Sequence, residues 1–292
     1  MFRGAWLLLL VGCNEIYGLD PTTVRIVDAR PPCKAGTPFS TGVEVQIAGN
    51  RSVEAARFTR NRGVAYLSLC PPDLPDPKRG CDLYTSVYST QTESFSGFSI
   101  MNGVSTMDVY DSYPSITSDN QHLLFGSERD GQTVRIYVAA TQNGSFDNPT
   151  ITRLAGTGTS ASNEPYIVGD GRVLYFSAEE MSSQLYRMEG APPTFGGKST
   201  LVPGVDIANN DEYAPVVRDD ELEMFFSSGR NLVLDLFMAT RASTSDAFGT
   251  PVRVANLSSA GNDWPVWITP DGCELYYIAK SGTVATLYVA RR

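Results

Sequence analysis

The sequence predicts an all-β fold, a five-bladed β-propeller built from four-stranded antiparallel blades. Three observations lead to this prediction. A repeat of about fifty residues runs along the chain, each repeat holds four short strand-like segments, and the two ends of the repeated region supply complementary parts of one blade. The composition agrees, because 14 Tyr, 13 Phe and 26 Gly accompany a single His, which is typical of many short strands joined by turns.

Three landmarks keep the same period. A proline marks one strand of each repeat at Pro114, Pro165, Pro215 and Pro265. An aromatic residue marks the last segment at Tyr137, Tyr186, Phe237 and Tyr288. A phenylalanine precedes a further strand-like segment at Phe39, Phe95, Phe146, Phe195 and Phe248. The first repeat lacks the proline but keeps the other segments, so the landmarks indicate five copies of one supersecondary unit.

Each copy contains four strands in a fixed order. One strand follows the phenylalanine, one carries the proline, one resembles Leu-Tyr-Phe-Ser and one resembles Leu-Tyr-Val-Ala. Asp170-Gly171 and Asp271-Gly272 separate the second and third of these strands, and Asp-Gly between strands is a strong hairpin signal. A four-stranded unit of this length is typical of a propeller blade, which must stack on its neighbours to bury both faces.

The ends of the repeated region predict how the ring closes. The propeller is expected over residues 39–292, and its first strand, within Phe39–Val45, completes the blade whose other three strands come from the C-terminal repeat. This arrangement removes an open sheet edge. An open ring or a sixth blade is the competing arrangement, but residues 14–38 are short and rich in proline. They are expected to act as a tether instead.

The first residues resemble an export signal. Arg3 precedes a short apolar segment that ends in Leu10-Val11-Gly12-Cys13, and this segment is too short to span a bilayer. The four residues resemble the lipobox of bacterial lipoproteins, which implies a signal peptide over 1–12, a lipidated Cys13 and a tether over 13–38. The alternatives are an ordinary secretory signal with a coincidental cysteine or an apolar N-terminal strand. Asn14 is compatible with sorting to the outer membrane.

Four further cysteines predict two disulfides, because disulfides are common in exported proteins. Three connectivities are possible. We expect Cys70 to pair with Cys81 across a proline-rich loop, and Cys33 to pair with Cys273, which joins the N-terminal segment to the last repeat. A metal site is the weaker interpretation, since no histidine lies near these cysteines and no Cys-x-x-Cys motif occurs.

The net charge limits the partners. It is −9 with a pI of about 4.7, whereas nucleic-acid binding requires a basic surface. Nucleic acid is therefore not an expected partner. An acidic surface favours basic partners, and a monomeric ring held to the membrane only by its lipid is expected.

The repeat resembles a known family. The pattern Pro-x-x-(Ser/Thr)-x-Asp-Gly-x-x-Leu-Tyr-Phe-x-Ser, followed by Asp-Leu-Tyr-Val-Ala, resembles the WD-repeat-like propeller repeat of the periplasmic protein TolB and of envelope lipoproteins. It is best preserved at Pro265–Gly272 and Tyr113–Asp119 and covers roughly residues 39–292. The resemblance implies a propeller in the bacterial cell envelope, and only loosely a role. Asp119-Asn120 and Asp219-Asp220 depart from the Asp-Gly pattern.

Catalytic motifs are scarce. The sole histidine, His122, follows the Asp119-Asn120 turn, where a solvent-exposed turn residue is more plausible than a catalytic base. The sequence contains no Gly-x-Ser-x-Gly elbow for a serine hydrolase. No phosphate-binding glycine-rich loop precedes a helix, so no cofactor, metal or catalytic residue is predicted.

Acidic residues before the proline strands form the remaining candidate site. If these strands line the axis, the acids lie around one mouth of the ring, with Trp264 beside them to stack on a sugar or peptide. The competing interpretation is that they are ordinary turn residues that bond the local backbone. The predicted rim consists of Glu54, Asp111, Glu164, Asp211, Glu212, Asp263 and Trp264.

Two functions are compatible with these features of the sequence. The first is a non-enzymatic envelope lipoprotein, facing the periplasm or the cell surface, that binds another protein or a basic peptide as a scaffold. The alternative is a carbohydrate-active propeller, either a glycosidase or a lectin, that binds sugar at the axial mouth. A unique pair of buried carboxylates on the axis would favour the alternative, whereas repeat-equivalent aliphatic and hydroxyl side chains would favour the first.

Overall fold

The computed structural model describes residues 32–47, 52–70, 80–106, 109–131, 133–158, 161–179, 182–196, 198–206 and 210–292. Two units divide the chain, Met1–Arg30 and Pro31–Arg292. The first unit, with the predicted signal peptide and Cys13, lies outside the described residues, as does most of the tether. Among the described residues, no helix is long and apolar enough to cross a membrane.

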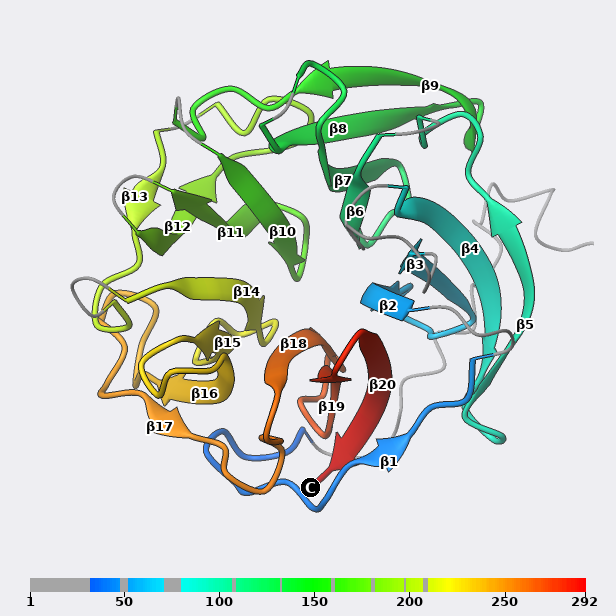
Figure 1. Ribbon diagram of the computed structural model, residues 1–292. Helices are drawn as coiled ribbons and strands as arrows, with labels where there is room; N and C mark the ends of the chain where they lie inside the picture. Colours follow the sequence, from blue (N-terminus) through cyan, green and yellow to red (C-terminus); the bar gives the residue numbers. More distant parts are fainter. Residues whose placement is uncertain are drawn as a thin grey trace, which may run out of the picture. The chain divides into compact units, whose positions relative to one another are not determined.

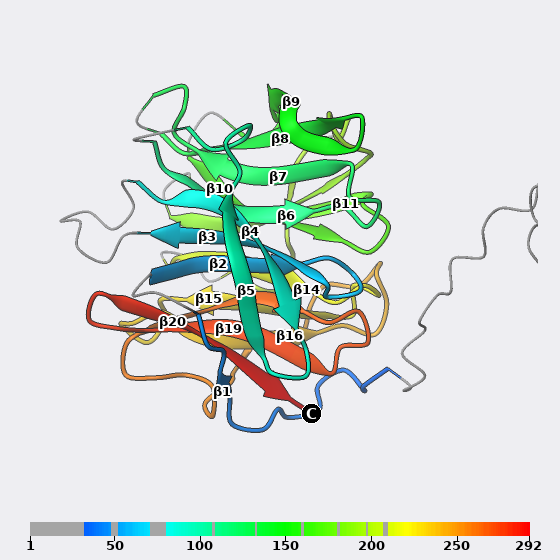
Figure 2. The same cartoon turned by 90° about the vertical axis from the view of Figure 1, so that its right-hand side faces the viewer.

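The second unit is a five-bladed β-propeller, which confirms the predicted fold (Figure 1). Five four-stranded antiparallel sheets surround a common axis. The first blade contains β2 (Ser52–Phe58), β3 (Val64–Cys70), β4 (Asp82–Ser89) and β5 (Ser94–Ile100). The second contains β6 (Asp111–Ile116), β7 (His122–Ser127), β8 (Arg135–Gln142) and β9 (Ser145–Arg153). Figure 2 shows the ring from the side, with β5 on the outside of the first blade.

The remaining blades repeat this order. The third contains β10 (Ser162–Val168), β11 (Val173–Glu179), β12 (Ser183–Glu189) and β13 (Thr200–Leu201). The fourth contains β14 (Glu212–Val217), β15 (Glu223–Ser228), β16 (Asp235–Thr240) and β17 (Val252–Arg253). The fifth contains β18 (Asn262–Ile268), β19 (Glu274–Ser281), β20 (Val284–Arg291) and β1 (Val43–Glu44). The first-named strand of each blade lies nearest the axis.

The repeated Thr-x-Asp motif builds the turn after several inner strands. After β6, the Thr117 hydroxyl donates to Asp119 and accepts the backbone N–H of His122. After β18, Thr269 bonds Asp271 in the same way and accepts the N–H of Glu274. These side chains satisfy backbone groups that a tight turn leaves unpaired. The acidic residue of the motif therefore stabilises the turn.

Aromatic side chains fill the space between neighbouring blades. Phe58 of the first blade contacts Trp267 and Tyr276 of the fifth, with ring centroids 4.9 and 4.6 Å apart. All three side chains are buried. Each blade thus buries a face that it could not bury alone, which explains why the repeats form a ring.

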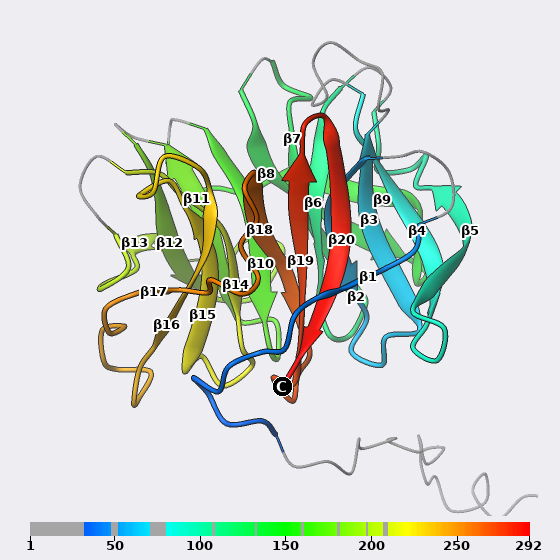
Figure 3. The ribbon, with the colours of Figure 1, turned by 60° about the horizontal axis from the view of Figure 1, so that its bottom comes forward.

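The chain closes the ring as predicted, with β1 paired to β20 in the C-terminal blade (Figure 3). The register aligns Val43 with Val289 and Glu44 with Tyr288. Backbone bonds on either side extend the pairing: Ser40 donates to Arg291 at 2.7 Å, and Val45 donates to Leu287 at 2.8 Å. No open edge is left between the first and last repeats, in agreement with the predicted reason for closure.

Both expected disulfides are present. Cys33 is bonded to Cys273, and Cys70 is bonded to Cys81. The first bond lies beside the closure, where the Cys33 N–H also donates to the Asp271 carbonyl at 2.8 Å. It joins segments 240 positions apart in the sequence. The second spans the ends of the loop between β3 and β4.

Candidate functional site

The inner strands bring a distinct set of side chains to the axis because each of the five contains a β-bulge. The pairing shifts register within β2, β6, β10, β14 and β18. A bulge adds an unpaired residue and redirects its side chain. In β6, β10 and β14 the shift falls at the residue before the proline, which is Tyr113, Glu164 and Ala214 in turn. In β2 it falls at Glu54 and in β18 at Val266.

The backbone at these bulges is unusual. Tyr113, Glu164 and Ala214 have φ values of 49°, 57° and 50°, in the left-handed region that side-chain-bearing residues rarely adopt. Such conformations persist where the surrounding structure enforces them, and they concentrate at binding sites. Three equivalent strands share this left-handed conformation, so it is a feature of the blade fold. The side chain at the position differs from blade to blade.

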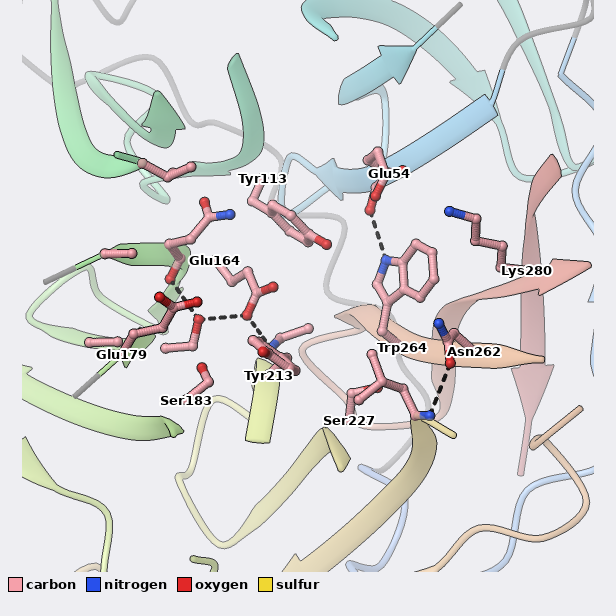
Figure 4. A pocket seen from close by; sticks show the side chains of 17 residues that line it. Glu54, Tyr113, Glu164, Glu179, Ser183, Tyr213, Ser227, Asn262, Trp264 and Lys280 are labelled. Carbon is pink, nitrogen blue, oxygen red and sulfur yellow. Dashed lines mark hydrogen bonds between the residues drawn. The ribbon is translucent and has the colours of Figure 1, made fainter. Parts of the chain in front are cut away.

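A cavity of about 330 Å³ opens at the axis beside these bulges (Figure 4). Its lining combines carboxylates, aromatic rings, amides and hydroxyls, a composition suited to orienting a polar ligand. The lining residues are Glu54, Tyr113, Val134, Ala161, Asn163, Glu164, Ser177, Ala178, Glu179, Ser183, Tyr213, Ala214, Ser227, Leu234, Asn262, Trp264 and Lys280. All five blades contribute to this set.

Glu164 is held firmly at the cavity. Its Oε2 atom accepts a hydrogen bond from the Ser177 hydroxyl at 2.7 Å and from the Ala214 N–H at 2.6 Å. The first bond fixes the carboxylate within its own blade, and the second joins it to the next blade. Two donors to one oxygen favour the ionised form and a single orientation of the side chain. Glu164 thus presents a pre-organised negative charge.

Trp264 forms the opposite wall of the cavity. Its indole Nε1 donates to the Glu54 carbonyl at 2.8 Å, which links the fifth and first blades. Because its donor is already used, the ring can offer only its face and edge to a ligand. Tyr113 and Tyr213 stand near it in the same cavity (Figure 4). Burial raises the pKa of Tyr213 to about 12, so its hydroxyl stays neutral at physiological pH.

Three other predicted rim acids have a structural role. Asp111, Glu212 and Asp263 are fully buried and do not line the cavity. Asp111 pairs with Arg129 at 3.1 Å, and Glu212 pairs with Arg230 at 3.0 Å. These two pairs occupy equivalent places in the second and fourth blades.

The contacts of these acids explain their recurrence. Asp263 accepts the backbone N–H of Ser259 at 2.5 Å, and Asp111 accepts the N–H of Thr106 at 2.6 Å. Each carboxylate therefore fixes the loop that enters its inner strand. Burial raises the pKa of both, and that of Asp263 to about 6. The turn interpretation of these acids agrees with their contacts.

The expected rim therefore separates into two groups. Glu54, Glu164 and Trp264 share the cavity, whereas the other four predicted residues do not line it. The fourth of these, Asp211, is exposed and accepts the Ser183 N–H at 2.9 Å. The separation follows from the bulge. Glu164 directly precedes Pro165 and faces the axis. Asp263 lies one residue before the equivalent position in its blade, and Asp111 and Glu212 lie two residues before it.

Sequence reasoning missed several cavity residues. Tyr113 directly precedes Pro114, as Glu164 precedes Pro165, so its offset from the proline was an available signal. Glu179, Tyr213 and Lys280 have no comparable signal, because they come from strand ends that approach the axis only after the blades assemble.

The axis beneath the cavity is crossed by Arg57 and Tyr166. The Arg57 guanidinium lies 4.4 Å from the centroid of the Tyr166 ring, although their strands, β2 and β10, belong to blades that are not adjacent. Burial, the largest effect, lowers the pKa of Arg57 to about 10, so it remains charged at neutral pH. Its Nε and Nη1 atoms have no hydrogen-bond partner among the described residues.

The side chains that line the cavity define the chemistry available there. The lining contains no histidine or cysteine, and His122 begins β7, half-buried, rather than lying exposed in the turn as expected. Among the described residues, no group of three or more His, Cys, Asp or Glu side chains is arranged to hold a metal ion. The chemistry available at the cavity is that of carboxylates, hydroxyls, amides and one amine.

Comparison with known proteins supports the fold. No family model matches the sequence, and no curated protein resembles it in sequence. TolB from Acinetobacter baumannii superposes with a TM-score of 0.56 at 12% identity, over 84% of this chain and 56% of that one. A putative TolB from Agrobacterium tumefaciens gives 0.51 at 15% identity, over 86% and 78%. The fold is that of a TolB-like propeller.

The same fold occurs in enzymes. A GH43 β-xylosidase/α-arabinofuranosidase from a compost microbial metagenome, solved with xylotriose, has a TM-score of 0.57 at 14% identity, over 87% of this chain and 95% of that one. This chain spans little more than half of the Acinetobacter TolB. At these identities the comparisons establish the architecture, and a TolB-like propeller is compatible with either a binding or a catalytic role.

Proposed function

We propose that this protein is a non-enzymatic binding module of the bacterial cell envelope that recognises another envelope protein or a peptide through the axial cavity. One contrast carries the proposal. The buried acids that fix the blades recur, whereas the three equivalent bulge positions in β6, β10 and β14 hold Tyr, Glu and Ala. A position that served only the fold would be expected to repeat with the blades. Non-repeating polar residues around one cavity are typical of a binding site.

The two disulfides support an exported location for the protein. Two disulfides in one chain are typical of an oxidising compartment such as the periplasm. We propose that the N-terminal residues act as a lipoprotein signal, that Cys13 carries the lipid and that residues 13–38 tether the ring to the outer membrane. This assignment rests on the sequence motif.

The direction of the cavity supports a role in recruiting a partner. Cys33 is fixed beside Asp271 in the turn between β18 and β19. Asn262 and Lys280, at the other ends of those two strands, line the cavity. A seven-residue strand is roughly 20 Å long, so Cys33 lies on the side of the ring away from the cavity. A partner can therefore enter the cavity from the face opposite to Cys33.

Affinity capture tests the proposal. Detergent-solubilised full-length protein is incubated with envelope extract, and captured proteins are compared with those of the double variant Glu54→Gln/Glu164→Gln. Asp170→Asn is the matched control, because it neutralises an exposed carboxylate in the turn between β10 and β11. We expect a partner that the wild type and the control retain and the double variant loses. Equal capture by all three forms would refute the axial site.

A carbohydrate ligand is the second candidate. The observation in its favour is that Glu54 and Glu164, from non-adjacent blades, share one cavity with the Trp264 ring. Paired carboxylates and an aromatic platform are the usual elements of sugar recognition and glycoside hydrolysis. Incubation with chromogenic xylosides and arabinosides tests for hydrolysis. Turnover that is lost in Glu164→Gln would replace the non-enzymatic proposal with a glycosidase.

A further inference from the structure

We propose that the axial cavity binds one primary ammonium group, supplied by a lysine side chain of a partner or by a free alkylamine. The proposal rests on the proposed function, since it names the chemical group that the cavity recognises. Four features of the described residues support it: the balance of charge, an unused hydroxyl, the aromatic walls and the closed floor.

Among the described residues, the side chains at the cavity carry more negative than positive charge. Glu54, Glu164 and Glu179 contribute −3 to the lining, and Lys280 contributes +1. Arg57, below the floor, adds a further +1 and interacts electrostatically with Glu164. The sum is −3 + 2 = −1. A net negative lining attracts a cation and repels an anion.

The Tyr113 hydroxyl supplies an acceptor that the fold does not use. The side chain is more than nine-tenths buried and projects into the cavity (Figure 4). No hydrogen bond joins this hydroxyl to another described residue. Because this hydroxyl faces the cavity, it can accept a hydrogen bond from a ligand that donates one. Primary ammonium has three donors, for which the Glu54 and Glu164 carboxylates and the Tyr113 oxygen are candidate acceptors.

Aromatic rings form the walls. Tyr113, Tyr213 and Trp264 surround the same space as the carboxylates (Figure 4). The electron-rich face of an aromatic ring attracts a cation, and the attraction increases when water is excluded. These rings also pack against the methylene chain that carries an ammonium group, which a small inorganic cation lacks. The walls therefore favour an alkylammonium over a bare metal ion.

The floor restricts how the ligand enters. Arg57 is buried, and it stacks on Tyr166 across the axis. These side chains obstruct the axis beneath the cavity, so the cavity is blind and a ligand enters end-on from one face. A terminal ammonium on a flexible alkyl chain has this shape.

Binding of simple probes tests the proposal. Solubilised full-length protein is titrated calorimetrically with n-butylammonium chloride, with butan-1-ol as the neutral isostere and tetramethylammonium as a cation without donors. We expect saturable binding of butylammonium and at least tenfold weaker binding of the other two. Equal affinity for butan-1-ol, or stronger binding of tetramethylammonium, would overturn the assignment.

Variants localise the site. Glu164→Gln should weaken butylammonium binding at least tenfold, and Asp170→Asn should leave it unchanged. If Glu164→Gln unfolds, Glu179→Gln provides a second test, because Glu179 is exposed. This variant should bind butylammonium about threefold more weakly than wild type. Arg57→Met should strengthen binding several-fold, because it removes a positive charge beneath the floor. No gain in affinity in a folded Arg57→Met protein would contradict the charge argument.

Two further experiments remain. One distinguishes a protein from a small molecule as the source of the ammonium group, and the other distinguishes the ammonium proposal from the proposed binding function. Acetylation of lysines in the envelope extract should abolish partner capture if the group belongs to a protein, whereas unchanged capture with tight binding of free amines indicates a small-molecule ligand. A partner lost in Glu54→Gln/Glu164→Gln but not displaced by butylammonium would refute the ammonium assignment alone. Equal capture by that double variant and wild type would refute the axial binding function itself.

Discussion

The guanidinium of Arg292 lies against the carboxylate of Glu223 in the neighbouring blade, with Nη2 2.5 Å from Oε2, and both side chains are fully buried. The same carboxylate accepts the Gly36 N–H at 2.7 Å, and the guanidinium lies 4.5 Å from the centroid of the Phe39 ring. This ion pair joins the fourth and fifth blades and the segment before β1. It therefore reinforces a closure that has only two residues of regular strand.

Arg292→Met is expected to lower the free energy of unfolding by about 3–5 kcal/mol, because Glu223 remains buried without its counter-charge. Equilibrium urea denaturation measures the change. The double variant Arg292→Met/Glu223→Gln should lose less than the sum of the two single variants, since it removes both charges together. Additive losses would show that the pair does not act as a unit.

The two disulfides should differ in their contribution to stability. In the chain-entropy model a link spanning 240 positions stabilises by about 5 kcal/mol and one spanning 11 positions by about 3 kcal/mol. We expect Cys33→Ser/Cys273→Ser to reduce Tm more than Cys70→Ser/Cys81→Ser, as measured by thermal circular dichroism. The opposite order would show that the β1–β20 pairing holds the closure without the covalent link.

Asp263 should make stability depend on pH. Burial, opposed by the hydrogen bond from Ser259, raises the pKa of this carboxyl to about 6. An acid whose folded pKa exceeds its unfolded value binds its proton more tightly when folded. The stability that this protonated carboxyl contributes to the folded state is therefore fully present below about pH 4 and is lost as the pH rises through about 6. The stability of Asp263→Asn relative to wild type should rise by about 1 kcal/mol between pH 5 and pH 7.5.

Urea denaturation at the two pH values measures this change, and Asp170→Asn is the exposed control. The relative stability of the control should vary little with pH. A fall in the relative stability of Asp263→Asn as the pH rises would contradict the sign of the effect.

The left-handed bulges predict a different response to glycine at two buried alanines. Ala214 has φ of 50°, whereas Ala239 lies within β16 and has no positive φ. Both are 2% exposed. Glycine relieves strain of about 1 kcal/mol in the left-handed region but adds flexibility at both sites. Ala214→Gly should therefore cost at least 1 kcal/mol less than Ala239→Gly in the free energy of unfolding, and equal costs would argue against strain.

Much of the fold was predictable because its signals are local or covalent. The proline and aromatic landmarks recur with every blade, so they predict five repeats. The incomplete first and last repeats predict the pairing of β1 with β20, and the cysteines predict links that join the same segments. Cys13 stays a prediction, because it lies outside the described residues.

The candidate site was only partly predictable. Glu54, Glu164 and Trp264 were selected together with Asp111, Glu212 and Asp263, because all of them precede the proline strand. The bulge separates them: an added residue reverses the alternation of side chains along a strand, so neighbouring acids point to different environments. One group binds the blade's own loops, and the other lines the cavity.

By itself, the sequence determined the number of blades, their order and the way the ring closes, because each of these follows from a pattern repeated along the chain. The tertiary structure alone decided what meets at the axis. Arg57 and Tyr166 come from blades that do not touch along the ring, yet their side chains stack. Such contacts depend on strand twist and bulge placement in five separate sheets, which no periodic pattern of residues records.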